Sequence, residues 1–180
     1  MPYGIPSLIT DTQRPSASLF SYYVFRPDYT EMYMEYAEVE FLLAENNGWN
    51  QTNYENGVRA SMQKWFVDPA DITAYIATLP PANQENVMTQ KYIALFMQPY
   101  EAWAEYRRTG FPQFLIKPGD QINLINPVEG SLTYTFTPLE NITDLPTRVK
   151  YPFNEATLNG ANYQEAAAGL TTYLTSFCPG

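Results

Sequence analysis

The sequence predicts a mainly α-helical domain of successive hairpins, followed by a small β-hairpin and long ordered loops. Apolar side chains recur at helical spacing, between capping and helix-ending residues, up to Gly110. After Pro112 this spacing stops, and short runs of strand-forming residues and several prolines follow. Because 45% of the 180 residues are hydrophobic, we expect a single domain with a sizeable core, or the C-terminal fragment of a larger protein. The helical core should cover residues 28–110 and the loop-rich region residues 111–180.

The first expected elements are a strand and a helix. Residues 1–27 contain four prolines, and SLFSYYVF at 18–25 has strand-forming residues without helical spacing, which predicts a loop and then one strand. Asp28 stands three residues before Glu31, as in a capping arrangement, and a helix is expected over residues 31–45. The apolar face of that helix should hold Tyr33, Ala37, Phe41 and Ala44.

An antiparallel partner helix should follow the turn Asn46-Asn47-Gly48, which ends the first helix. The spacing of Thr52 and Glu55 is that of a capping box, and it predicts a second helix up to Phe66. The apolar positions of this helix are Tyr54, Val58, Met62 and Trp65. Two antiparallel helices joined by a short loop are therefore expected.

Prolines divide the segment that follows. Asp68-Pro69 supplies an N-cap and a proline at the first helical position, so a short helix should run to Leu79, before two further prolines. A fourth helix is expected over residues 86–97. Pro99 cannot continue that helix and should start a fifth one, which ends at Gly110.

The remaining segment predicts short elements. Residues 122–125 and 132–137 resemble strands around a turn at 127–130, which indicates a small β-hairpin. Beyond it, one short helix is expected at 163–168, after the break Asn159-Gly160. Most of the rest should be ordered loop packed on the helices.

Composition excludes several kinds of function. Ten Lys and Arg against nineteen Asp and Glu give a formal charge of -9, which makes nucleic acid and anionic membranes poor partners. The chain has no histidine, and Cys178 is its one cysteine, so triads with histidine and histidine-zinc sites are excluded. We expect Cys178 to be a reduced surface thiol without function, and we expect no cofactor.

No targeting or membrane segment is recognisable. No apolar run reaches the roughly 20 residues of a membrane-spanning helix, and the N-terminus lacks the regions of a signal peptide. Met1 followed by a proline-rich extended segment is typical of an expression start placed inside a longer protein. We therefore expect the chain to be a piece of a longer protein.

The aromatic and arginine residues of QKYIALFMQPYEAWAEYRRTGFP, residues 90–112, are the first candidates for a binding site. Trp103 and Tyr106 could stack on a sugar ring, but their spacing of three places them on one helix face, and we favour core packing. Arg107 and Arg108 could grip a carboxylate or a partner surface. Their place at a helix C-terminus favours interaction with the helix dipole and the last carbonyl groups.

Acidic residues offer the only candidates for catalysis or metal binding. Glu101 and Glu105, one turn apart, could bracket a glycosidic bond, but a solvated face paired with arginines is the simpler interpretation. A second acidic stripe comprises Glu31, Glu35, Glu38 and Glu45. A straight helix does not supply the turning loop of a calcium site, so we interpret this stripe as solvated surface and expect no metal site.

The loop residue Trp49 is the aromatic side chain placed best to reach solvent. A tryptophan after a helix-ending glycine commonly folds back on the preceding helix, which we favour. Two segments match the glycosylation acceptor pattern, Asn50-Gln51-Thr52 and Asn141-Ile142-Thr143, and we interpret both matches as coincidental.

Four segments in the same order resemble the SusD/RagB family of outer-membrane nutrient-binding lipoproteins. They are YAEVEFLLAENNGW from Tyr36, YENGVRASMQKW from Tyr54, the 90–112 segment, and PTRVKYPFNEATLNGANYQEA from Pro146. The resemblance covers the C-terminal portion of that family only. The segment 171–180 departs from the tryptophan-containing end expected of it.

The resemblance implies an α/α superhelix of tetratricopeptide-like hairpins, although the standard tetratricopeptide residues are missing here. It also implies a lipid-anchored protein on the outer face of the outer membrane in Bacteroidetes, which covers a SusC-like TonB-dependent transporter. Such a protein captures an oligosaccharide or peptide for import. We expect the signal peptide and lipidated cysteine of the family to belong to the full-length protein and to lie outside this C-terminal portion.

We therefore expect a non-catalytic binding protein of a nutrient uptake system. The alternatives are a helical scaffold that binds another protein without a nutrient ligand, or, less favoured, a glycoside hydrolase. No catalytic or ligand-binding residue is assigned, because the ligand residues of the family are thought to lie largely outside this portion or in variable loops.

Overall fold

The computed structural model describes residues 20–123, 133–137, 144–146, 151–152 and 154–168. The chain divides into two compact units, and each is described by itself. Thr30–Leu115 forms the helical unit, and the described parts of Met1–Tyr29 and Ile116–Gly180 belong to the other unit.

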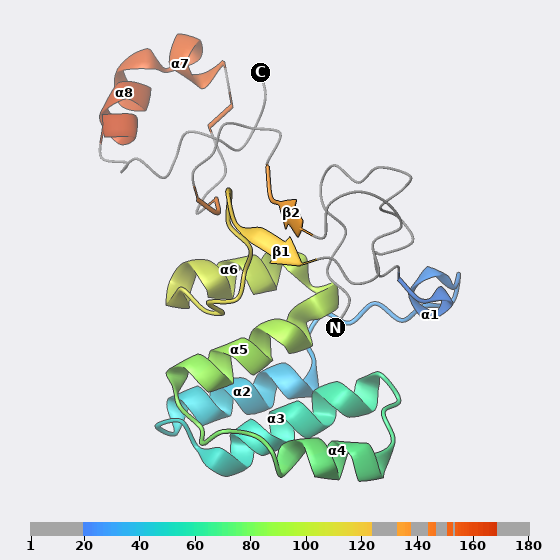
Figure 1. Cartoon of the computed structure of the whole chain (residues 1–180). Coiled ribbons are helices and arrows are strands. Elements are labelled where there is room, and N and C mark those ends of the chain that lie inside the picture. Colours follow the sequence, from blue (N-terminus) through green and yellow to red (C-terminus); the bar gives the residue numbers. More distant parts are fainter. Residues whose placement is uncertain (1–19, 124–132, 138–143, 147–150, 153, 169–180) are drawn as a thin grey trace. The chain divides into compact units, whose positions relative to one another are not determined.

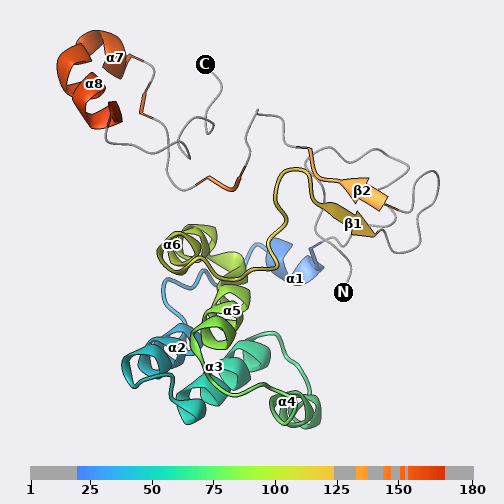
Figure 2. The same cartoon turned by 60° about the vertical axis from the view of Figure 1, so that its left-hand side comes forward.

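The helical unit consists of antiparallel hairpins, as predicted (Figure 1). Helices α2 and α3 form the first hairpin, α3 turns back into α4, and α5 packs on both α2 and α3. A 3₁₀ turn, η2, then leads into α6 (Figure 2). The bounds are α2 Tyr36–Asn46, α3 Gln51–Lys64, α4 Pro69–Ile76, α5 Gln84–Ala94, η2 Leu95–Met97 and α6 Pro99–Thr109.

Side-chain caps set the start of three helices. Asp68 accepts a hydrogen bond from the backbone N–H of Ala70 at 2.8 Å, which confirms the predicted N-cap of α4. Asn50 caps α3 by accepting from the N–H of Asn53 at 3.1 Å, so the expected capping box at Thr52 is wrong by two residues. Asn83 does the same for α5, which therefore begins two residues before the expected position. Asparagine is as good a cap as threonine, and here it comes first along the chain.

Glycine ends two helices as predicted. Gly48 and Gly110 have φ angles of 67° and 75°, which is left-handed backbone that a residue without a Cβ adopts at low cost. Pro99 starts α6, also as predicted. Two bulky residues, Trp49 and Phe66, adopt the same left-handed conformation with φ angles of 63° and 58°.

The predicted strand at 18–25 is wrong in the part that the structure describes, because Tyr22–Phe25 forms a short helix, α1. A strand needs a partner strand for its backbone groups, whereas one helical turn satisfies them locally. Edge-on ring contacts accompany the turn, with centroids 6.0 Å apart for Phe20 and Phe25 and 5.7 Å apart for Tyr23 and Tyr29.

The first long helix begins five residues later than predicted, at Tyr36. Tyr33 consequently lies outside it and is 94% exposed instead of buried. The expected cap from Asp28 and Glu31 is not formed. Glu35 stands at the N-cap position, and its buried side chain pairs with Lys64 instead of capping the helix. A long-range contact thus replaces the local one.

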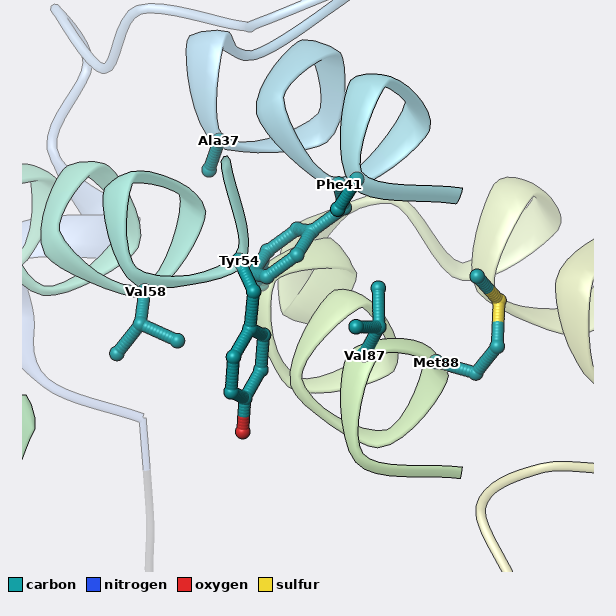
Figure 3. Packing of buried hydrophobic residues seen from close by; sticks show 8 residues of the cluster. Ala37, Phe41, Tyr54, Val58, Val87 and Met88 are labelled. Atoms are coloured by element: carbon teal, nitrogen blue, oxygen red, sulfur yellow. The ribbon is translucent and has the colours of Figure 1, made fainter. Parts of the chain in front are cut away.

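The hydrophobic core lies between α2, α3 and α5 (Figure 3). Phe41 is completely buried, and the backbone of α3 approaches its ring closely at Gly57. A Cβ on Gly57 would lie 2.7 Å from the ring, so only glycine allows this approach. The buried cluster comprises Ala37, Phe41, Ala44, Tyr54, Val58, Val87, Met88 and Ala94.

The second unit contains the predicted antiparallel strand pair. Strand β1, Gln121–Asn123, pairs with β2, Thr133–Thr135, with Ile122 opposite Tyr134. The predicted turn at 127–130 lies outside the described residues. An ion pair at 3.1 Å joins Lys117 to Asp144.

Two short helices, rather than one, occupy the last described segment. Helix α7 spans Glu155–Leu158 and α8 spans Gly160–Ala168. The predicted helix at 163–168 therefore begins three residues early, because Asn159 alone separates the two helices and Gly160 already belongs to α8. The rings of Tyr151 and Tyr163 meet edge-on at 5.8 Å. Most of the expected ordered loop lies outside the described residues.

None of the helices in the described ranges is long and apolar enough to span a lipid bilayer.

We predict that Gly57→Ala destabilises the protein by about 1–2 kcal/mol, as a urea titration followed by circular dichroism would measure. Alanine favours a helix over glycine by about 1 kcal/mol, but overpacking costs about 2–3 kcal/mol here, the upper part of the usual range, because a Cβ 2.7 Å from the completely buried Phe41 ring forces that ring to move. Gln63→Ala, at an exposed position of the same helix, is the control and should change stability little. A Gly57→Ala protein as stable as the wild type would contradict the close approach of α3 to Phe41.

Candidate functional site

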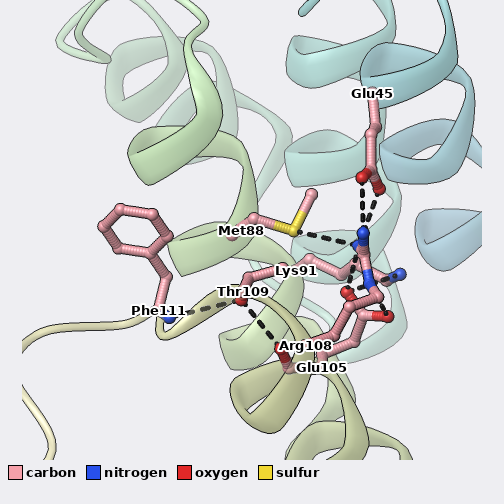
Figure 4. A network of polar contacts seen from close by, with 7 residues as sticks. All are labelled: Glu45, Met88, Lys91, Glu105, Arg108, Thr109 and Phe111. Carbon is pink, nitrogen blue, oxygen red and sulfur yellow. Dashed lines mark hydrogen bonds and ion pairs between the residues drawn. The ribbon is translucent and has the colours of Figure 1, made fainter.

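Charged side chains from three helices meet where α2 faces α5 and α6 (Figure 4). We call this group the charged seam. Its members are Glu38 and Glu45 from α2, Lys91 from α5, and Glu105 and Arg108 from α6.

Arg108 joins α6 to α2. Its Nη1 and Nη2 donate to Oε1 and Oε2 of Glu45 at 2.7 and 2.8 Å, which is a bidentate pair. Nη2 also donates to Oε2 of Glu105 at 2.8 Å. The hydrogen bonds to Glu45 and then to Glu105 raise the pKa of Arg108 above its ordinary value. The guanidinium is therefore a fixed cross-link between two helices.

Lys91 joins α5 to α6 from a buried position. The residue is 1% exposed, and its Nζ lies 3.3 Å from Oε2 of Glu105. Burial by itself raises the pKa of Glu105, but the hydrogen bond from Arg108 and the charge of Lys91 outweigh that effect. The pKa of Glu105 is lowered in consequence, and the carboxylate stays ionised at neutral pH.

Glu38 is the opposite case within the same seam. It is 8% exposed, and its burial is the main cause of a raised pKa. The charge of Lys91 lowers that pKa, while the neighbouring carboxylates of Glu101, Glu105 and Glu35 raise it. The charged seam thus stabilises the ionised form of Glu105 and disfavours the ionised form of Glu38.

A second polar group lies near the start of α2. Glu35 is buried, forms an ion pair with Lys64 at the end of α3, and accepts a hydrogen bond from Nε2 of Gln98 at 3.1 Å. Glu40 accepts hydrogen bonds from Nδ2 of Asn53, at 2.7 Å, and from the Tyr36 hydroxyl. These two hydrogen bonds lower the pKa of Glu40.

The interpretation of the acidic stripe as solvated surface is wrong for three of its four members. Glu31 is exposed, whereas Glu35 and Glu38 are buried and Glu45 is held by Arg108. The basic partners come from α3, α5 and α6, far along the chain. Neither Lys64 nor Lys91 has a sequence signal of its own, which is why sequence reasoning missed them.

The aromatic candidates of the 90–112 segment are half-buried. Trp103 and Tyr106 are both partly exposed, and the fully buried residue of α6 is Ala102. The guanidinium of Arg107 lies 4.7 Å from the centroid of the Trp103 indole ring. Arg108 binds a carboxylate, which is one of the two roles considered for it, but that carboxylate is Glu45 of the same helical unit and not a ligand.

The two carboxylates considered for glycoside hydrolysis have different environments. Glu101 is exposed, and Glu105 is bound by Lys91 and Arg108. A general acid needs a raised pKa, and the pKa of Glu105 is lowered. Glu105 is therefore unsuited to protonate a leaving group.

Two of the remaining candidates, Trp49 and Asn50, have roles in the fold. Trp49 folds back and packs against the core cluster, as favoured, and Asn50 caps α3. Asn141-Ile142-Thr143 and Cys178 lie outside the described residues. Within the described part of the chain, no three His, Cys, Asp or Glu side chains gather in a way that could hold a metal ion.

The charged seam therefore stabilises the packing of the helices, because each of its cations is bound by carboxylates of the same unit. It fixes α6 against α2 and α5 and presents no unoccupied cation to an anionic ligand.

Comparison with known proteins identifies a family. The family model SusD-like_2, described as "Starch-binding associating with outer membrane", matches residues 1–152. Functionally curated proteins give no significant match.

Solved structures give the same result. A Bacteroidetes protein named "AC2a SusD-like" is 30% identical, has a TM-score of 0.58, and aligns with 80% of this chain and 29% of its own. A protein named "chitin-binding protein" is 27% identical, with a TM-score of 0.52 and coverage of 79% and 31%. The chain thus spans about a third or less of the length of these two proteins.

We predict that Glu105→Gln lowers the free energy of unfolding at pH 7 by about 2 kcal/mol, because the buried Lys91 then lacks its carboxylate partner. Glu38→Gln is the matched control on the facing helix. It should cause no loss or a gain, since the ionised Glu38 is disfavoured by burial. Urea unfolding measures both. Equal losses for the two variants would show that their carboxylates do not differ as described.

A second prediction concerns acid. The pKa of Glu105 is below its ordinary value of 4.5 in the folded protein, so its stabilising contribution is present above that pH and is lost as the pH falls through the lowered pKa. Stability of the Glu105→Gln variant should therefore fall less than that of the wild type between pH 5 and about pH 3.

Glu38 has the opposite sign, because its pKa is raised and its protonation on acidification favours the folded state. Acid should consequently destabilise Glu38→Gln more steeply than the wild type. Urea midpoints at several pH values test both variants. Parallel pH profiles for the wild type and both variants would contradict the two assignments.

Proposed function

This chain belongs to the SusD-like family, and we propose that it is part of a non-catalytic binding protein that captures a glycan for uptake across the outer membrane. The family-model match over residues 1–152 is the observation that carries this proposal. The family is described as starch-binding, and one similar structure is named as chitin-binding. A glycan is therefore favoured over a peptide as the captured nutrient.

The charged seam supports a binding role rather than a hydrolytic one. Glycoside hydrolysis needs one carboxyl group that stays protonated and a second that is ionised, both beside the substrate. Glu105 is ionised and occupied by Lys91 and Arg108. Glu38 has a raised pKa, but it is buried between helices, where it cannot reach a sugar.

The proposed location is the outer face of the outer membrane, where the whole protein would be held by an N-terminal lipid. The family description, which includes association with the outer membrane, supports this location. The proposed partner is a SusC-like TonB-dependent transporter, which the protein would cover and supply with captured glycan. The helical hairpins offer the packed, extended surfaces that such repeats use for protein contacts.

We expect isothermal titration of the full-length protein to show heat with maltoheptaose or chitohexaose and none with a mixture of peptides of similar size. A parallel assay for reducing ends should show no hydrolysis of either sugar. Binding of the peptides but of neither sugar would show that the captured nutrient is a peptide. Release of reducing ends that Glu101→Gln abolishes would instead establish an enzyme.

The partner is tested with the full-length protein in its native outer membrane. Purification after mild cross-linking should enrich a TonB-dependent transporter, which mass spectrometry would identify. If neither sugar nor peptide binds and only other proteins are enriched, the helical scaffold without a nutrient ligand becomes the correct description.

A further inference from the structure

Helix α2 has the reverse of the polarity expected of a helix at a protein surface. Such a helix turns its charged residues toward water and keeps its apolar stripe inside. The three charged residues of α2 are instead turned inward: Glu38 and Glu40 are buried, and Glu45 is held by Arg108 in the charged seam. The side of α2 that remains for solvent is therefore left to other residues.

The outward residues of α2 are apolar. Tyr36, Val39, Leu42 and Leu43 recur three or four positions apart, on the side of the helix that faces away from the buried cluster. Tyr36 is 64% exposed, Leu42 38% and Leu43 41%, and Val39 is partly exposed. We call these four residues the outer face of α2.

Exposed apolar side chains continue directly before the helix. Met32, Tyr33 and Met34 are 40%, 94% and 59% exposed. Six large apolar side chains between Met32 and Leu43 thus have exposed fractions of 38% to 94%. A single exposed apolar residue is ordinary on a protein surface, but a group of this size marks a surface that another element covers.

The architecture of the helical unit indicates what kind of element covers the outer face. Stacked helical hairpins bury their apolar sides against their neighbours, and the terminal hairpin of a stack carries a polar outer surface. The α2–α3 hairpin has α5 packed on one side (Figure 2). Its other side, at the outer face of α2, is apolar. This hairpin therefore has the character of an internal member of a stack, which has a neighbour on both sides.

The full-length protein is large enough to supply that neighbour. The two similar structures align over 29% and 31% of their own chains, so more than two thirds of each lies outside the aligned part. A second copy of this unit is a poorer occupant. The helical unit has eleven acidic residues against five basic ones, and two such units placed face to face would repel each other.

We propose that a further helical hairpin, from the part of the full-length protein outside this chain, packs onto the outer face of α2. Its contacting helix is amphipathic and carries apolar residues at helical spacing, which fit between Val39, Leu42 and Leu43. Helix α2 then becomes an internal helix, with the buried cluster on one side and this hairpin on the other. The proposal does not depend on which nutrient is captured, so it stands or fails separately from the proposed function.

Photo-cross-linking in the full-length protein identifies the occupant. The photoreactive residue p-benzoylphenylalanine replaces Tyr36, where it keeps an aromatic ring at an exposed position, and in a second variant it replaces Leu43. After illumination, mass spectrometry should find a cross-linked peptide of the same molecule that lies outside residues 1–180. The same replacement of Gln63, an exposed position of α3, is the control and should not form that cross-link.

Thiol labelling measures the covering of the face independently. In a full-length protein without reactive native thiols, Cys178→Ser included, Leu43→Cys should react with a maleimide about tenfold more slowly than Gln63→Cys, because the packed hairpin must first open. Both positions are exposed in the structure of this chain. In concentrated urea the two variants should react at the same rate, which shows that folding causes the difference.

Four results would overturn the proposal. Equal labelling of the two folded variants, or no cross-link from either Tyr36 or Leu43, would show that the outer face is open to solvent. A cross-link to a residue within 1–180 would show that this portion covers its own helix. A cross-linked dimer would assign the face to a second copy, and a cross-link to the transporter would assign it to that partner. All four leave the capture of a glycan untouched.

Discussion

The ion pair of one buried lysine anchors the last helix of the helical unit. Lys91 is almost completely buried on α5 and meets Glu105 of α6, which also binds Arg108, and Arg108 in turn holds Glu45 of α2. A buried ammonium group requires a carboxylate partner. Leaving the ammonium unpaired in the interior costs much more free energy than the ion pair contributes to stability. The position of α6 is therefore constrained by charge, whereas the packing of α2 on α3 and α5 is set by apolar contact around Phe41.

Charge thus positions α6, and apolar packing positions the other helices. For this reason the aromatic and arginine segment at 90–112 does not identify the ligand-binding residues. Lys91, Glu105 and Arg108 of this segment form ion pairs that join α5, α6 and α2, and Arg107 lies over Trp103 of the same helix. The segment identifies the family because it builds the fold. Phe66 lies outside this segment, directly after α3, where it has left-handed backbone and is exposed.

Local chemistry made several features predictable. The cap at Asp68, the helix start at Pro99 and the helix end at Gly110 all follow from interactions within a few residues. The failures have different causes. Asn50 and Asn83 cap their helices ahead of the expected positions, and the segment at 22–25 forms a local helical turn. The start of α2 instead depends on the long-range pairing of Glu35 with Lys64.

By itself, the sequence determined the helical class, the order of the hairpins, the lack of histidine chemistry and the resemblance to the SusD/RagB family. Only the tertiary structure decided that an acidic helix face is buried, that Glu38 and Glu105 differ in pKa, and that Phe66 is strained and exposed. The physical reason is distance along the chain. Helical periodicity and caps are local, but three of the four charges that shift the pKa of Glu38, those of Lys91, Glu101 and Glu105, lie about 50 to 70 positions away, and only folding brings them close.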